Sequence, residues 1–184
     1  MAASAQTRYY HSSSPGTASS DVTGMTVRFK LSDDDVQNTQ YPIPLPVTTS
    51  AINLSWRKSS KINFVTSPAG AITNLRWFIS GGPPTGVSFF ARVQSPGIYV
   101  TATAADQNGI HNFTDTTANQ AANNAGQYTS LAPLAVNSGT VLSHPSVGEG
   151  SQVFVETQLA LLGTYTGGPG PGTPFQITYR YSET

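Results

Sequence analysis

The chain has no cysteine and few charged residues, and each shortage excludes a class of protein. Without cysteine, the 184 residues hold no disulfide, Cys-ligated zinc site, iron–sulfur cluster or thiol nucleophile. Charged residues make up 10% of the chain, against about 25% in ordinary soluble proteins. Nine basic residues balance nine acidic ones, so the chain lacks the basic footprint of a nucleic-acid-binding protein. These shortages favour a structural or binding protein over an enzyme.

Long hydrophobic runs are missing as well. No apolar stretch approaches the roughly 18 residues that cross a bilayer. The first 16 residues also lack the apolar core of a signal peptide. We therefore expect a protein that is made in the cytoplasm and does not enter a membrane.

The residues that are abundant predict an all-β fold. Strong helix formers are scarce, whereas Thr, Val and aromatic residues suit a pleated, half-buried surface. The 17 glycines and 13 prolines, together with Asn and Ser, supply turns. The aromatic residues (8 Phe, 8 Tyr and 2 Trp) can form a core, so the chain is too apolar to be disordered throughout.

Alternation of apolar and polar residues marks the predicted strands. In residues 25–31 one face carries Met25, Val27, Phe29 and Leu31, and in residues 151–161 one face carries Val153, Val155, Thr157, Leu159 and Leu161. The other predicted strands are residues 51–58, 61–66, 72–79, 86–93, 97–102 and 175–181. Strands at this spacing predict an antiparallel β-sandwich, jelly-roll or immunoglobulin-like, of about eight or nine strands. The domain is expected to span residues 25–184.

Three segments fall outside this pattern. Residues 1–24 are polar and do not alternate, so we expect an extended or disordered N-terminal arm. It is either a disordered tail or an arm that orders against a neighbouring subunit through Tyr9 and Tyr10, and its removal is expected to leave the domain folded. Residues 103–139 are rich in Ala, Asn, Gln and Thr and predict a long polar insertion, with a weak helix signal near residues 117–125.

The third segment, residues 41–46, has the sequence Tyr-Pro-Ile-Pro-Leu-Pro. Its three alternate prolines remove three N–H donors and favour extended backbone. The segment therefore cannot be a central strand. We expect it to cross an edge of the sandwich or to lie on a partner.

No arrangement of residues predicts catalysis or a cofactor. The histidines, His11, His111 and His144, lie in polar or loop sequence without a nucleophile motif. The acidic run of residues 33–35 predicts a solvated turn, with calcium binding as the alternative, because it lacks a complete calcium-loop pattern. We expect no enzyme activity and no cofactor.

Eight of the nine basic residues lie in or beside predicted strands: Arg28, Lys30, Arg57, Lys58, Lys61, Arg76, Arg92 and Arg180. They are interpreted either as outward-facing charges that protect sheet edges or as a basic face that docks on an acidic partner. Arg57 and Arg76 adjoin Trp56 and Trp77, whose indoles are expected in the core, with an interface role as the alternative.

The order of several short stretches resembles that of small virion structural proteins of tailed bacteriophages. The stretches are residues 42–46 (PIPLP), 55–58 (SWRK), 74–78 (NLRWF), 136–139 (VNSG), 148–159 (GEGSQVFVETQL) and 178–181 (TYRY). The resemblance covers roughly residues 25–184 and contains no catalytic motif. It implies a role in the virion without identifying the part of the particle that is bound.

The resemblance and the composition together predict a capsid decoration (cement) protein that binds and stabilises the head shell. A tail or neck protein (tube, collar or joining) and a carbohydrate-binding receptor-recognition module are the alternatives. The expected partners are the major capsid protein or other virion proteins and sister copies, with a trimer as the expected oligomer and no nucleic acid or membrane. The expected location is the virion, on the capsid surface or in the tail region. The interface candidates are Tyr9, Tyr10, Tyr41, Pro42, Pro44, Pro46, Arg57 and Arg76.

Overall fold

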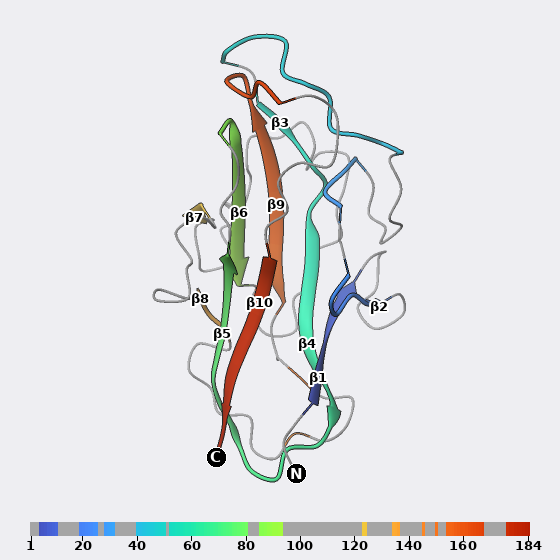
Figure 1. Ribbon diagram of the computed structural model, residues 1–184, viewed down its shortest axis with the longest axis vertical. Helices are drawn as coiled ribbons and strands as arrows, with labels where there is room; N and C mark the ends of the chain where they lie inside the picture. Colours follow the sequence, from blue (N-terminus) through green and yellow to red (C-terminus); the bar gives the residue numbers. More distant parts are fainter. Residues whose placement is uncertain are drawn as a thin grey trace.

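Ten β-strands and no helix form the regular structure in the part of the chain that the computed structural model describes (Figure 1). The described residues are 4–10, 19–25, 28–31, 40–50, 52–80, 85–93, 123–124, 134–136, 145, 150, 154–167 and 176–184. Within these ranges there is accordingly no helix that could cross a membrane. For these described residues the expectation of an all-β fold is confirmed.

The strands have the following bounds: β1 (Ser4–Tyr10), β2 (Ser19–Asp21), β3 (Ile52–Leu54), β4 (Lys58–Thr66), β5 (Ile72–Ser80), β6 (Val87–Val93), β7 (Asn123–Asn124), β8 (Leu134–Ala135), β9 (Val155–Leu162) and β10 (Gln176–Glu183). They form two antiparallel sheets. The larger sheet has seven strands in the order β2-β1-β4-β9-β6-β7, and β3 also pairs with β9. The smaller sheet has the order β10-β5-β8. Because β3, β4 and β6 all pair with β9, this strand is central to the larger sheet.

Five strands lie where the alternation predicts them: β4, β5, β6, β9 and β10. Two predictions differ from the structure. Residues 28–31 are not in a regular strand, and the predicted strand 51–58 is interrupted after Leu54. The predicted strand 97–102 lies outside the described residues, as does most of the weak helix signal. Its described residues, Asn123 and Asn124, form β7 instead, in keeping with the low helix propensity of asparagine.

The N-terminal segment also differs from the expectation of an arm. Ser4–Tyr10 form β1, which pairs with β4 along its whole length and lies between β4 and β2 in the sheet. Tyr9 is buried, and the Ser4 hydroxyl donates a hydrogen bond of 2.8 Å to the Thr66 hydroxyl. The alternation of apolar and polar residues does not detect this strand, because its inward face carries Ala5, Thr7 and Tyr9, which form only a weak apolar pattern.

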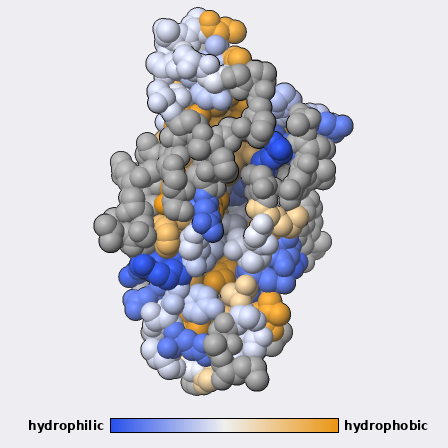
Figure 2. Space-filling model, viewed as in Figure 1, coloured by the Kyte–Doolittle hydropathy of each residue, from blue (hydrophilic) through white to orange (hydrophobic). Residues whose placement is uncertain are grey.

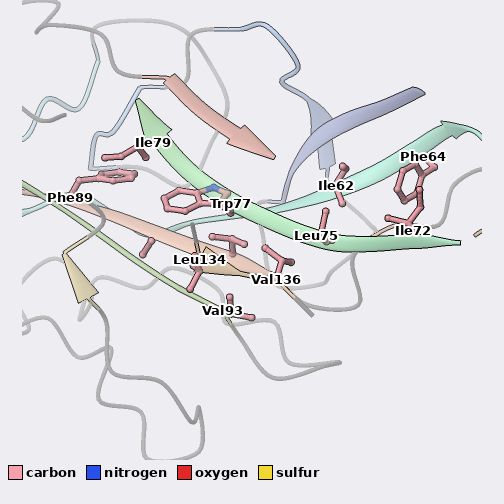
Figure 3. Packing of buried hydrophobic residues seen from close by; sticks show 12 residues of the cluster. Ile62, Phe64, Ile72, Leu75, Trp77, Ile79, Phe89, Val93, Leu134 and Val136 are labelled. Atoms are coloured by element: carbon pink, nitrogen blue, oxygen red, sulfur yellow. The ribbon is translucent and has the colours of Figure 1, made fainter. Parts of the chain in front are cut away.

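The hydrophobic core lies between the two sheets. The larger sheet contributes Ile62, Phe64, Phe89, Ala91, Val93 and Val155, and the smaller sheet and its flank contribute Ile72, Leu75, Trp77, Ile79, Leu134 and Val136 (Figure 3). Trp77 of β5 stacks on Phe89 of β6, with ring centroids 6.4 Å apart, so aromatic contacts join the sheets. Phe64 meets Tyr181 of β10 edge to face at 5.4 Å. The expectation of a core position is confirmed for Trp77.

A polar contact joins the sheets as well. The hydroxyl groups of Ser60 on β4 and Tyr179 on β10 lie 3.0 Å apart, and the Tyr179 hydroxyl donates to the Ser60 carbonyl at 3.3 Å. Burial raises the pKa of Tyr179 well above its usual range, although the hydrogen bond with Ser60 acts in the opposite direction. The neutral phenol is therefore the form that fits between the sheets.

We predict that Tyr179→Phe lowers the free energy of unfolding by about 1 kcal/mol at neutral pH, the typical value of one hydrogen bond. The substitution should also flatten the alkaline decline in stability. The folded-state pKa of Tyr179 lies above the unfolded value of about 10, so its contribution is complete below about pH 10 and is lost at higher pH. Urea denaturation at pH 8 and pH 10.5 measures both effects, with the exposed Tyr41→Phe as the control. An equally steep alkaline decline in Tyr179→Phe would contradict the prediction.

For β1 we predict that Tyr9→Ala lowers the free energy of unfolding by about 3 kcal/mol or more, as for other buried aromatic side chains. Removal of residues 1–10 should cost at least as much, because it also exposes the edge of β4. Gln6→Ala, on the opposite face of β1, serves as the control. Denaturant unfolding of the three variants is the measurement. If Tyr9→Ala and Gln6→Ala are equally stable, β1 does not contribute to the folded sheet.

Candidate functional site

Buried polar side chains gather where the strand formed by β3 and β4 is interrupted. Leu54 of β3 is opposite Ala160, and Lys58 of β4 is opposite Thr157. Residues 55–57 therefore face only residues 158–159 of β9, so the β3–β4 side has one extra residue. This is a β-bulge, which bends a strand and re-aims its side chains.

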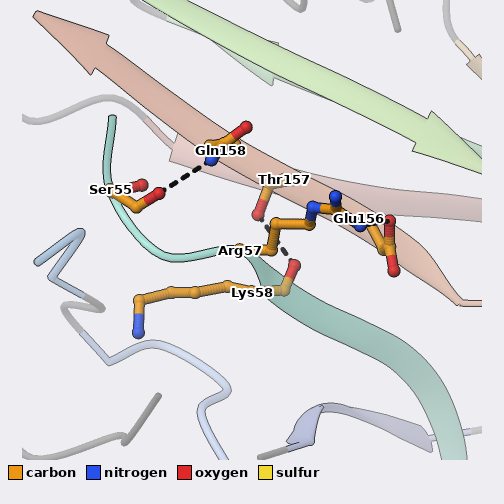
Figure 4. Close-up of polar contacts among 6 residues, drawn as sticks. All are labelled: Ser55, Arg57, Lys58, Glu156, Thr157 and Gln158. Carbon is orange, nitrogen blue, oxygen red and sulfur yellow. Dashed lines mark hydrogen bonds and ion pairs between the residues drawn. The ribbon is translucent and has the colours of Figure 1, made fainter. Parts of the chain in front are cut away.

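Four hydrogen bonds hold the bulge, and Ser55 takes part in all of them. Its N–H donates to the Leu159 carbonyl at 2.8 Å, and its hydroxyl accepts from the Leu159 N–H at 3.0 Å. The same hydroxyl donates to the Trp56 carbonyl at 2.8 Å, and the Gln158 side-chain amide donates to the Ser55 carbonyl at 2.8 Å (Figure 4). Ser55 and Gln158 are fully buried, so these bonds satisfy groups that water cannot reach.

On the side of the bulge that faces away from β9, residues 28–31 lie next to Trp56, although they do not form a regular strand. The Trp56 N–H donates to the Lys30 carbonyl at 3.0 Å, and the Leu31 N–H donates to the Tyr41 carbonyl at 2.8 Å. Phe29 meets Phe89 of the core edge to face at 5.0 Å. The bulge thus turns the Trp56 N–H away from β9, and this N–H binds the Lys30 carbonyl instead.

A buried ion pair lies beside the bulge. Arg57 Nη1 and Glu156 Oε2 are 3.9 Å apart, and both side chains are buried. Lys58 points in a different direction in Figure 4, and its Nζ lies 3.4 Å from the Tyr9 hydroxyl and 4.6 Å from the centre of the Tyr9 ring. We refer to Ser55, Arg57, Lys58, Glu156, Thr157 and Gln158 as the polar cluster. Ser55, Thr157 and Gln158 bond to the backbone of the paired strands, Arg57 pairs with Glu156, and Lys58 contacts Tyr9, so the cluster holds β3, β4 and β9 in register.

The polar cluster changes the interpretation of the basic residues. Lys30, Arg57 and Lys58 are buried, whereas the sequence suggested outward-facing charges or a basic docking face. Arg76 is half-buried on β5, opposite Arg180 and Ala135. In the described part of the chain, no group of three or more His, Asp or Glu residues is placed to hold a metal ion. The three histidines and the acidic run of residues 33–35 lie outside that part.

The other interface candidates are distributed between the interior and the surface. Tyr9 is buried in the sheet, and Tyr10 is half-buried with its ring edge-on to Phe154 at 5.1 Å. In contrast, Tyr41, Pro42 and Pro44 are exposed, and Pro46 is half-buried. The structure therefore brings the residue 41–46 candidates together on the surface and separates them from Tyr9 and Arg57.

We refer to residues 41–47 as the proline-rich segment. It has no regular secondary structure, in agreement with the expectation that it is not a central strand. The exposed fractions are 60% for Tyr41, 47% for Leu45 and 93% for Val47, with Ile52 of β3 at 46%. Figure 2 shows hydrophobic residues at the end of the molecule where this segment lies. The segment is therefore an exposed apolar surface with a fixed backbone attachment, because the Asn53 side-chain amide donates to the Pro44 carbonyl at 2.9 Å.

No family model, curated protein or solved structure matches the chain. The surfaces and buried contacts described above are thus the basis for a functional inference. Sequence reasoning missed the roles of Ser55, Glu156 and Gln158. The alternation in the predicted strand 151–161 did not reveal these roles, because Glu156 and Gln158 share the face that is expected to be in water.

We predict that the Arg57–Glu156 pair is strongly coupled. Arg57→Met or Glu156→Met alone should each cost about 3–5 kcal/mol of folding stability, because each leaves the other group charged and buried. The double variant Arg57→Met/Glu156→Met should cost less than the sum of the two single losses. Denaturant unfolding of the complete cycle is the measurement, with the exposed Arg180→Met as a control. Strictly additive losses would show that the two side chains do not interact.

Proposed function

We propose that the protein is a virion structural protein of a tailed bacteriophage, and specifically a decoration (cement) protein that binds and stabilises the head shell. In this proposal the two sheets form a β-sandwich scaffold of the jelly-roll or immunoglobulin-like kind. The scaffold carries surface segments that contact other virion proteins. The protein is made in the host cytoplasm and resides on the capsid.

The observation that carries the proposal is the proline-rich segment. Exposed apolar side chains that lie close together are typical of surfaces that bind other proteins. Residues 36–56 contain no charged residue, so the surface offers apolar and backbone contacts rather than charge. Proline restricts the backbone in advance, which reduces the entropy lost when a partner binds. Many copies on one particle would add avidity to a modest single contact.

The contacts of the buried polar side chains support a structural role for the protein. Arg57 and Glu156 pair with each other, and Ser55 and Gln158 hold the backbone of the bulge. These groups stabilise the scaffold that presents the proline-rich segment. A rigid scaffold with an apolar surface segment is what a cementing protein requires, because it must hold neighbouring shell subunits in place without changing them.

The test is binding of the purified protein to tailed-phage heads assembled without it. We expect occupancy of the shell, seen by electron microscopy, and a rise in the melting temperature of the heads. Leu45→Asp/Val47→Asp should weaken this binding at least tenfold, because a charge would enter an apolar contact. Val65→Asp, which changes an exposed valine on β4, is the matched control and should bind normally.

Other outcomes would change the assignment. Heads that neither bind the protein nor gain stability would overturn the decoration role. Self-assembly of the purified chain into rings or tubes would indicate a tail or neck protein. Micromolar binding to a glycan array would indicate a carbohydrate-binding module.

A further inference from the structure

The outer face of the smaller sheet carries two arginines directly opposite each other. Arg180 of β10 lies opposite Arg76 of β5, and Ala135 of β8 lies on the other side of Arg76. Arg180 is exposed and Arg76 is half-buried. Their chain neighbours Trp77 and Tyr179 pack into the core instead. The row across the three strands, arginine, arginine and alanine, therefore brings two positive charges together on the outer face.

The neighbouring rows of the same face add no acidic side chain. Thr178 lies opposite Phe78 on one side of the two arginines, and Ser182 lies opposite Thr73 on the other. In Figure 1, β10 lies in the foreground beside β5, and Figure 2 shows strongly hydrophilic residues over this part of the same view. These rows of β5 and β10 thus present a positively charged surface bordered by hydroxyl groups.

Two arginines of the larger sheet, in contrast, each have an acidic neighbour. Arg8 of β1 lies between Lys61 and Asp21, and Arg57 lies 3.9 Å from Glu156. Like charges directly opposite each other destabilise a sheet, and arginine does not lose its charge at any working pH. An anionic group that binds both arginines of the smaller sheet would relieve the repulsion between them.

Two features hold these arginines in position. The Arg180 guanidinium lies 5.7 Å from the centre of the Phe78 ring, a cation–π contact on the same face. Next to the pair, between Arg180 and Ser182, β5 has one extra residue, and Asn74 there has a φ of +51°. Such a bulge bends the strand and re-aims its side chains. Side chains that are positioned in advance lose less entropy when they bind a ligand.

We propose that Arg76 and Arg180 bind two carboxylates of an acidic segment of a partner protein, which lies extended across β5 and β10. Alternate residues of an extended chain project from one face about 6.6 Å apart. The Cβ atoms of directly opposite residues in a sheet are about 5 Å apart, so two arginine side chains reach two such carboxylates. Each guanidinium can bind its carboxylate through two parallel N–H groups.

The number of charges favours a protein carboxylate over a nucleic acid. A nucleic acid is held through many phosphates and requires a broad basic surface, whereas this chain has no net charge and the face offers two arginines. Two guanidiniums match two carboxylates one to one. That the acidic segment belongs to a subunit of the head shell rests on the proposed function, but peptide binding by the purified chain does not.

The first experiment is fluorescence anisotropy of the full chain with a labelled six-residue peptide that alternates glutamate and threonine. A peptide that alternates glutamine and threonine is the uncharged control. We expect saturable binding of the acidic peptide only. Arg76→Gln and Arg180→Gln should each weaken it at least tenfold, because each removes one of the two guanidiniums. Arg8→Gln removes the same charge from the larger sheet and is the matched control, with circular dichroism to check that all variants are folded.

The second experiment separates a built site from general attraction between charges. Phe78→Leu keeps an apolar side chain and both arginines but loses the ring beside Arg180, and it should weaken peptide binding about threefold. Equal binding of the two peptides would overturn the proposal. So would equal losses in Arg8→Gln and the two arginine variants of the smaller sheet, or tighter binding of a labelled oligothymidine than of the acidic peptide.

The same variants distinguish this site from the head contact. If Arg76→Gln and Arg180→Gln lose the peptide and also bind heads more weakly, the acidic segment belongs to the shell. If they lose the peptide while heads are bound normally, the carboxylate site is supported and its partner is a different protein. Heads that do not bind the unmodified chain would overturn the proposed function and leave a positive peptide result in place.

Discussion

The central constraint in this molecule is the pairing of β9 with β3 and β4, which carry one extra residue in the bulge at residues 55–57. β3 and β4 pair with the same side of β9, and their registers differ by one residue because of the bulge at residues 55–57. Ser55 and Gln158 make this offset stable by satisfying the backbone groups that the bulge releases. A slip of one residue would exchange the two faces of a strand. The buried hydrogen bonds of the bulge therefore keep the core residues of β4 and β9 on the inner face.

The rest of the fold depends on this arrangement. Because the bulge turns the Trp56 N–H away from β9, it can bind the Lys30 carbonyl, and the neighbouring Phe29 packs against Phe89. Residues 28–31 in turn bind Tyr41, and Asn53 of β3 binds Pro44. A series of hydrogen bonds thus runs from the centre of the sheet to the exposed proline-rich segment. The conformation of the surface is set by the interior through these contacts.

Sequence patterns predicted the fold where a strand has one apolar face. β5 and β6 were predicted nearly to the residue, and the surface position of the proline-rich segment followed from its three prolines. β1 was missed because Ala5, Thr7 and Tyr9 do not form an apolar pattern, and its partner β4 lies more than 40 residues away along the chain. Period-two alternation identifies the two faces of a strand, but it does not reveal whether both are covered.

The burial of Glu156 and Gln158 illustrates this limit. They lie on the face of β9 opposite Val155 and Leu159, and alternation by itself would leave that face in water. The bulge that uses Gln158 has no sequence signature, because it contains neither glycine nor asparagine. Arg57 and Arg76 looked alike in sequence, each beside a tryptophan. The position of Arg57 inside the bulge separates them, since it brings Arg57 to Glu156.

The strand pairing has a consequence for the order of folding. β1 pairs with β4, so it cannot pair until the residues near 60 have been synthesised. β5 pairs with β10, so it cannot complete its sheet until residues 176–183 have been synthesised. Such distant partners make folding slow, because the entropy of closing long loops is lost before the contacts form. While the chain is still being synthesised, β5 has Trp77 and Ile79 but no β10 to pair with. The apolar side chains of β5 therefore stay exposed until residues 176–183 have been synthesised, which makes assistance from chaperones valuable during synthesis.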